Sequence, residues 1–194
     1  MRSLRYVVMI AILLGLTSAP ARADGFIIPF VGFNFGGDSG SSCATLTDCQ
    51  QKRLNLGVSF VSMGPVFGLE EDISYARHFF GEGPQIGPDN SVFSAMTNLL
   101  IGVGTGPVRP YVVGGVGLIR PHVPSLTGSI TSLGSGQNAF GYDVGGGLIG
   151  MFGKHFGVRG DVRLFRTVQD VNLLIFTGQK LDFWRASVGL ALAF

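Results

Sequence analysis

The feature that most constrains this sequence is an alternation of large apolar residues with small or polar ones, which returns in many short segments. In the segment from Trp184 to Phe194, every second residue starting at Trp184 is apolar, and the intervening residues include Arg185, Ser187 and Gly189. Successive side chains of a β-strand point to opposite faces, so a period of two separates the two sets. The alternation therefore predicts β-strands that each have one apolar face and one face of small and polar residues.

Eight segments are predicted to be strands of this kind. They span residues 26–35, 53–61, 66–77, 91–103, 109–120, 139–150, 157–166 and 184–194. Each has about the length that a tilted strand needs to cross a bilayer. The alternation leaves the faces of segment 109–120 undecided.

The connections between these segments carry a second pattern. Three are short, near residues 62–65, 104–108 and 152–155, and four are long, at about 36–52, 78–90, 121–138 and 167–180. Long and short connections alternate strictly, which places all the long loops at one end of an antiparallel sheet and both termini at the other. The sequence therefore predicts an all-β fold, an eight-stranded antiparallel up-and-down transmembrane β-barrel.

Residues 1–23 have the features of a secretory signal peptide: two arginines before an apolar run over residues 6–16, and an A-x-A cleavage site at 21–23 that contains a third arginine. The alternative is an N-terminal membrane helix, but a helix that spans a bilayer needs about 20 apolar residues. We expect cleavage before Asp24, which leaves residues 24–194 as the barrel domain. Removal of the first segment changes 14 basic and 12 acidic residues to 11 and 12, so no basic surface indicates a nucleic-acid partner.

A family resemblance adds to this interpretation. The signal peptide, the stretches PFVGFNFGG, RPYVVGGVGLIR and GVRGDVRLFR, and the aromatic last residue resemble the small eight-stranded outer-membrane β-barrel proteins, the OmpA/OmpX-like family. The resemblance implies a monomer surrounded by lipid in the outer membrane of a Gram-negative-type bacterium, with periplasmic termini. In that family the barrel-assembly machinery reads the last strand, and the matching residues here are Trp184, Leu190, Leu192 and Phe194.

A secreted, lipocalin-like barrel is the soluble alternative. It would also have eight strands, but its large apolar residues would point inward around a ligand. The face opposite the large residues is predicted here to hold glycine, serine, asparagine and charged residues, which are too small and polar to line an apolar pocket. We therefore expect the large residues to face lipid.

Charged residues then fall on the lumenal face of several strands. By parity they are Glu70, Asp72, Asp143, Arg159, Asp161, Arg163 and Arg185. The interior of an eight-stranded barrel is just wide enough for side chains to fill, and unpaired charges there are costly, so we expect a hydrogen-bonded network that plugs the lumen. The alternative is that this network is a gate that passes small ions.

Glu71 does not fit the pattern, because its parity places a carboxylate on the lipid face near the middle of a strand. The pattern leaves two explanations open. Either a β-bulge lies at residues 70–71, or the strand register differs there.

The only two cysteines, Cys43 and Cys49, lie in the first long loop. In an oxidising periplasm they are predicted to form a disulfide, and two free thiols are the alternative. The three histidines, His78, His122 and His155, lie in different connections, which indicates neither a metal site nor a catalytic triad.

The sequence thus predicts a structural or surface-interaction protein with a plugged lumen and long extracellular loops. A narrow small-solute channel, gated by the lumenal charges, is the first alternative. A lipid-modifying barrel enzyme is the second, but it requires a Ser/His/acid cluster near one rim, and no strand carries such a grouping. We expect no enzymatic activity and no cofactor.

Overall fold

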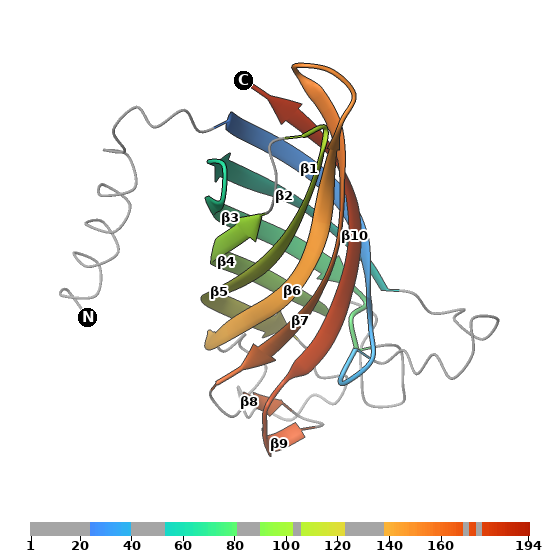
Figure 1. Ribbon diagram of the computed structural model, residues 1–194. Coiled ribbons are helices and arrows are strands. Elements are labelled where there is room, and N and C mark those ends of the chain that lie inside the picture. The colour runs from blue at the N-terminus through green and yellow to red at the C-terminus, as the bar shows by residue number, and fades with distance from the viewer. Residues whose placement is uncertain are drawn as a thin grey trace, which may run out of the picture.

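The computed structural model describes residues 24–39, 53–80, 90–102, 106–122, 138–168, 171–173 and 176–194. Eight strands close into an antiparallel barrel, and two further strands form a separate sheet (Figure 1). The barrel strands are β1 (Asp24–Phe35), β2 (Arg53–Met63), β3 (Phe67–Arg77), β4 (Ser91–Gly102), β5 (Val108–His122), β6 (Ala139–Met151), β7 (Phe156–Thr167) and β10 (Asp182–Ala193). The predicted fold class is confirmed.

Each barrel strand pairs with its neighbour in the chain, and β1 pairs with β10 to close the sheet. The order around the barrel is β1-β10-β7-β6-β5-β4-β3-β2, so β1 lies opposite β5, and β3 lies opposite β7. These two opposite pairs bring together side chains that are far apart in the sequence. In the described part of the chain, no helix is both long enough and apolar enough to cross a membrane.

The two ends of the barrel differ as predicted. Short connections join β2 to β3, β4 to β5 and β6 to β7 at the end drawn uppermost in Figure 1, which we call the turn end. The four longer connections leave the opposite end, which we call the loop end. The first barrel strand begins at the turn end, and the last one finishes there (Figure 1).

One prediction about the connections is wrong. The segment 167–180 was expected to be loop throughout, but it contains β8 (Val171–Leu173) and β9 (Phe176–Gln179), which form a two-stranded antiparallel sheet. The segment contains Val, Ile, Phe and Thr, residue types that favour strands. These two strands, of three and four residues, are too short to cross a bilayer and therefore lack the long alternation of the barrel strands.

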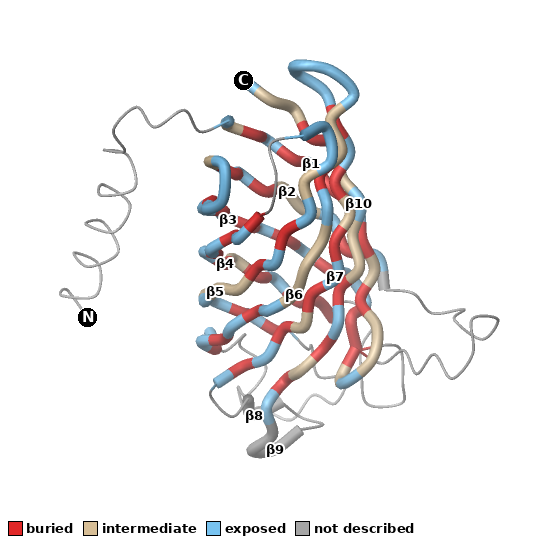
Figure 2. Tube along the Cα trace, in the orientation of Figure 1, coloured by how far each residue is buried: buried red, intermediate tan, exposed pale blue. Residues whose placement is uncertain are grey.

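The alternation of faces is confirmed on the barrel strands, where buried and exposed residues follow one another along the chain (Figure 2). Large apolar residues point outward: Leu54, Leu69 and Val112 are 56%, 61% and 59% exposed. The structure also decides the faces of β5, because Val112 and its outward neighbours alternate with buried Tyr111 and Val113.

Glu71 lies on this outer surface in an uninterrupted register. It pairs with Phe60 of β2 on one side and Thr97 of β4 on the other, and the pairing continues without a shift along β3. Thr97 Oγ1 donates to the two carboxylate oxygens of Glu71 at 2.9 and 3.1 Å. Both expected explanations, a bulge or a different register, are therefore wrong. The carboxylate does point outward, and Thr97 provides it with a hydrogen-bond donor.

The interior has three layers rather than the uniformly small and polar lining that was expected. Near the turn end lies an apolar group, the turn-end cluster: Phe26, Ile28, Val61, Met63, Leu100, Tyr111, Val113, Ile149 and Ala191. Near the loop end lies the loop-end cluster: Ala76, Phe79, Phe80, Val92, Met96, Ile119, Ala139, Phe165, Leu181 and Phe183. Along β6, the buried Asp143 falls between members of the two clusters, and along β10 Arg185 does the same.

Candidate functional site

The middle layer of the lumen consists of the seven charged residues selected by parity, and we call it the charged layer. Strand β3 supplies Glu70 and Asp72, β6 supplies Asp143, β7 supplies Arg159, Asp161 and Arg163, and β10 supplies Arg185. All seven are buried. The arginines of β7 face the carboxylates of β3 across the lumen, because these strands lie opposite one another in the barrel.

Arg163 is the centre of the charged layer. Its Nη2 lies 3.0 Å from Glu70 Oε2 and 3.0 Å from Asp161 Oδ2, and its Nη1 lies 3.3 Å from Asp143 Oδ2. The Oδ2 of Asp72 is 4.0 Å from Nη1. One guanidinium, with 0% of its side chain exposed, thus contacts carboxylates from three strands.

Arg159 contacts two of the same carboxylates from the turn-end side. Its Nη1 donates to Glu70 Oε1 at 2.6 Å, and its Nη2 lies 3.0 Å from Asp161 Oδ2. Its Nε donates to the hydroxyl of Tyr111 at 2.6 Å, and that hydroxyl donates to Asp161 Oδ2 at 3.0 Å. Tyr111 was missed at the sequence level because the faces of its strand were undecided. Its inward parity within RPYVVGGVGLIR was the signal available.

Arg185 forms the most regular pair of the layer. Its Nη1 and Nη2 donate to the two oxygens of Asp72, each at 2.9 Å, which is the bidentate geometry of a strong guanidinium–carboxylate contact. The guanidinium carbon lies 4.8 Å from the ring centroid of Phe30 and 4.7 Å from that of Phe165. Two aromatic faces and one carboxylate therefore offset the loss of water around a fully buried cation.

Neutral side chains satisfy further oxygens of the carboxylates. Asn98 Nδ2 donates to Glu70 Oε2 at 3.1 Å, and Ser59 Oγ donates to Asp72 Oδ2 at 3.0 Å. Ser187 Oγ donates to Asp161 Oδ1 at 2.8 Å. The small inward residues of the predicted pattern thus leave room for the charged side chains and also donate hydrogen bonds to them.

Glycines on β6 make room for the long side chains of β7. A Cβ atom at Gly145 would lie 2.8 Å from the Cα and 2.9 Å from the Cγ of Arg163. At Gly147 it would lie 2.5 Å from the Cβ of Asp161 and 2.7 Å from the hydroxyl of Tyr111. All four distances are shorter than van der Waals contact, so glycine at positions 145 and 147 permits the close approach of these side chains.

The family follows from a sequence match, which agrees with the closed barrel and its apolar outer surface. Residues 9–194 match the profile of the outer membrane protein beta-barrel domain. The chain belongs to the outer membrane protein β-barrel family. Its setting is therefore the lipid of a bacterial outer membrane, and its buried ion pairs are the interior of an outer-membrane barrel.

Solved barrels of known source share the fold. Neisserial surface protein A is similar with a TM-score of 0.62 and 14% identity, over 88% of this chain and 97% of that one. The N-terminal barrel of Pseudomonas aeruginosa OprF is similar at 0.52 and 16%, over 88% and 97%. Yersinia pestis Ail is similar at 0.52 and 14%, over 88% and 99%. A search of curated protein sequences returned no match.

The remaining predicted residues of this family member fall outside the charged layer. Trp184, Leu190 and Phe194 are exposed on the outer surface, at 41%, 47% and 81%, and Leu192 is half-buried. The cysteine pair, at positions 43 and 49, lies outside the described residues, so the disulfide stays a prediction. Within the described ranges, no three His, Cys, Asp or Glu side chains gather as a metal site would require.

Proposed function

We propose that this outer-membrane barrel is closed to solutes and acts as a structural or surface-interaction protein. The observation that carries the proposal is the charged layer, which spans the lumen between two apolar clusters. The proposal places the loop end outside the cell and the termini in the periplasm. It also includes cleavage after residue 23, assembly through the last strand, a monomeric state and no enzymatic activity.

Closure follows from the energetics of the buried pairs. A hydrated ion on a path through the barrel would have to separate guanidinium groups from carboxylates that they contact at about 3 Å, and removing one partner of a buried pair costs about 3–5 kcal/mol. It would also have to cross the turn-end cluster, which includes Phe26, Ile28 and Leu100 at 2% exposure or less. Both barriers oppose a conducting path.

A role at the surface is supported by the loop-end connections, since exposed loops on a rigid scaffold are where partners are recognised. The structure of Ail was determined with a heparin analogue, sucrose octasulfate, at 12% identity and a TM-score of 0.51. That similarity concerns the fold alone. For this chain, we propose that partners are recognised by the connections between β1 and β2, between β3 and β4 and between β5 and β6.

The test of closure is single-channel recording of the purified protein in a planar bilayer. We expect no discrete conductance steps from the wild type. Arg163→Ala opens space in the charged layer but leaves the turn-end cluster in place, so we expect it to stay silent as well, like Arg166→Ala on the outer face of the same strand. Regular steps from the wild type would refute the closed barrel and favour the alternative, a narrow channel gated by the charged layer.

The surface role is tested separately by replacing each of those three connections with a short Gly/Ser linker. The variants are displayed on bacteria, and adhesion to a heparin-coated surface is measured beside the wild type. We expect at least one replacement to abolish adhesion without changing the amount of folded barrel. Equal adhesion of all variants and of cells that lack the protein would contradict recognition of a heparin-like partner by these connections.

A further inference from the structure

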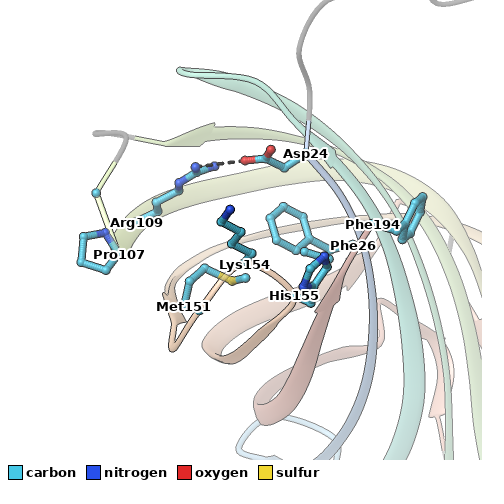
Figure 3. A pocket seen from close by; sticks show the side chains of 11 residues that line it. Asp24, Phe26, Pro107, Arg109, Met151, Lys154, His155 and Phe194 are labelled. Atoms are coloured by element: carbon cyan, nitrogen blue, oxygen red, sulfur yellow. Dashed lines mark ion pairs between the residues drawn. The ribbon is translucent and has the colours of Figure 1, made fainter.

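The turn end of the barrel contains a pocket of about 510 Å³, and no residue of the charged layer lines it (Figure 3). It is lined by residues of β1, β5, β6 and β10 and of the two nearby turns, among them Asp24, Phe26, Arg109, Met151, Lys154 and His155. Pockets of a few hundred Å³ that combine an apolar lining with a few polar groups are typical of small-ligand sites. The pocket thus has the size of a binding site.

The inner wall of this pocket is apolar and closed. Phe26 belongs to the turn-end cluster and is 2% exposed, and Met151 and Ala193 pack against that cluster. The buried cluster separates the pocket from the charged layer. A ligand can therefore enter from the turn end but cannot pass into the barrel.

Two cationic side chains, one histidine and one acidic side chain line the pocket. Arg109, Lys154 and His155 line it, and Asp24 is the one acid among its lining residues. Arg109 Nη2 lies 3.0 Å from Asp24 Oδ2, and because β5 and β1 are opposite strands this pair spans the mouth of the barrel (Figure 3). An anionic ligand could therefore contact two cationic side chains, with Asp24 as the acidic side chain that competes for Arg109.

The members of the Arg109–Asp24 pair are held differently. The side chain of Arg109 is 17% exposed, and its Nε is buried with no hydrogen-bond partner among the described residues. The side chain of Asp24 is 56% exposed. The guanidinium is thus the fixed partner with a donor to spare, while the carboxylate can turn to water when another anion arrives.

The turn that carries Lys154 and His155 is fixed to the barrel. Ala193 N donates to the carbonyl of His155 at 2.9 Å, and Phe152 N donates to the carbonyl of Phe156 at 2.9 Å. Lys154 extends from this turn into the pocket (Figure 3). The backbone therefore holds Lys154 and His155 beside Arg109.

Exposed aromatic rings surround the same end. Phe152, Phe156 and Phe194 are 80%, 62% and 81% exposed. Bands of outward aromatic residues mark the membrane interface in outer-membrane barrels. The pocket therefore lies at the level of lipid headgroups, next to the leaflet that borders the turn end.

We propose that this pocket binds a phosphate group, carried by a phospholipid headgroup of that leaflet or free in solution. A phosphate offers several acceptor oxygens, so it can accept from Arg109 and Lys154 together, with an apolar portion of the ligand against Phe26 and Met151. This inference goes beyond the closed barrel and does not depend on it, because a conducting barrel could carry the same pocket.

The test uses the full chain, produced in the outer membrane of a bacterial host and purified in detergent. Binding of phosphatidylglycerol is measured by native mass spectrometry, with inorganic phosphate and diacylglycerol added separately as competitors. We expect Arg109→Gln and Lys154→Gln each to weaken binding about tenfold, the factor for one lost hydrogen bond to a charged group. Arg120→Gln, an exposed cation near the other end of β5, is the matched control and should bind like the wild type.

Asp24→Asn provides a change of opposite sign. Because it removes the acid that competes for Arg109, we expect it to tighten phosphatidylglycerol binding, a result that a purely structural ion pair would not give. Each variant is first checked for the heat-dependent gel shift of a folded barrel. Lys154 is exposed in a turn, so its variant remains informative if Arg109→Gln does not fold.

The competitors separate the sources of the phosphate. Displacement of the lipid by inorganic phosphate at similar concentrations supports a phosphate site that takes the free ion, and a preference for the lipid supports the headgroup. Equal binding by the wild type, Arg109→Gln and Lys154→Gln would overturn the proposal. So would displacement by diacylglycerol as efficient as by phosphatidylglycerol, since it would show a purely apolar site.

Discussion

Replacement of Arg163 by methionine removes the central cation of the charged layer while keeping a side chain of similar length. Of the four carboxylates near Arg163, those of Glu70, Asp161 and Asp72 keep a contact with one of the other two arginines. Asp143 has no other ion pair among the described residues. The substitution therefore leaves one buried carboxylate without a cation, which costs about 3–5 kcal/mol in the free energy of unfolding.

A second substitution shows where that cost arises. Asp143→Asn removes the carboxylate that Arg163→Met leaves alone, so the double variant should recover about half of the lost stability or more. Asp143→Asn by itself should cost less than Arg163→Met, since the other carboxylates still neutralise the arginine. The coupling between the two sites should be favourable in the wild type.

The assay is equilibrium unfolding in urea of the protein inserted in lipid vesicles. Trp184, which is 41% exposed on the outer surface, reports the transfer from lipid to water by its fluorescence, and the heat-dependent gel shift gives an independent measure. Arg166→Met is the control, because Arg166 is exposed on the same strand. Two results would refute this description of the charged layer. One is an Arg163→Met variant that unfolds at the same urea concentration as the wild type, and the other is a double variant no more stable than Arg163→Met.

Three further changes test other parts of the structure by the same urea assay. Gly57→Ala should lower the midpoint, because the new Cβ would lie 2.5 Å from a backbone oxygen of β3; an unchanged midpoint would contradict this packing. Burial raises the pKa of Asp38, with the Asp182 carboxylate acting in the same direction, so the stability of the folded state falls as pH rises through that raised pKa. Asp38→Asn should therefore raise the midpoint at pH 7 and leave it unchanged at about pH 3, below both the folded and the unfolded pKa; equal effects at both pH values would exclude this cause. Glu71→Gln should raise the free energy of unfolding by about 1 kcal/mol, because it removes an outward carboxyl charge while an amide can still accept from Thr97; a lower midpoint would show that the carboxylate itself is stabilising.

Parity along the strands was enough to predict which side chains enter the lumen. Glu70, Asp143 and Arg163 each alternate with large outward residues, and the structure places all three inside. Parity cannot predict which of them meet. The contact between Arg163 and Glu70 joins opposite strands, so it depends on the closure of the barrel and on the stagger of its strands.

The apolar clusters show a second limit of the pattern. Ile28, Phe165 and Phe183 are large and apolar but have inward parity, and the structure buries them near the ends of the lumen. The rule that large apolar residues face lipid therefore fails at these three positions. Their position along the barrel axis, rather than their face alone, explains why they are apolar while residues between them are charged.

Side-chain contacts that depend on the exact strand register also could not be predicted from the sequence. The hydrogen bond from Thr97 to Glu71 requires the pairing of β3 with β4, and the Arg109–Asp24 pair requires two strands on opposite sides of the barrel. Neither residue pair is close in sequence. Only the closed sheet brings the members of each pair together.

The most direct test of the charged layer is hydrogen exchange of arginine side chains in protein labelled with ¹⁵N-arginine. Arg163 has 0% of its side chain exposed, whereas Arg166 is exposed on the same strand. We predict that the guanidinium protons of Arg163 persist for hours after transfer into D₂O, while those of Arg166 exchange before the first spectrum. Exchange of Arg163 as rapid as that of Arg166 would contradict a closed, dry layer of ion pairs across the lumen.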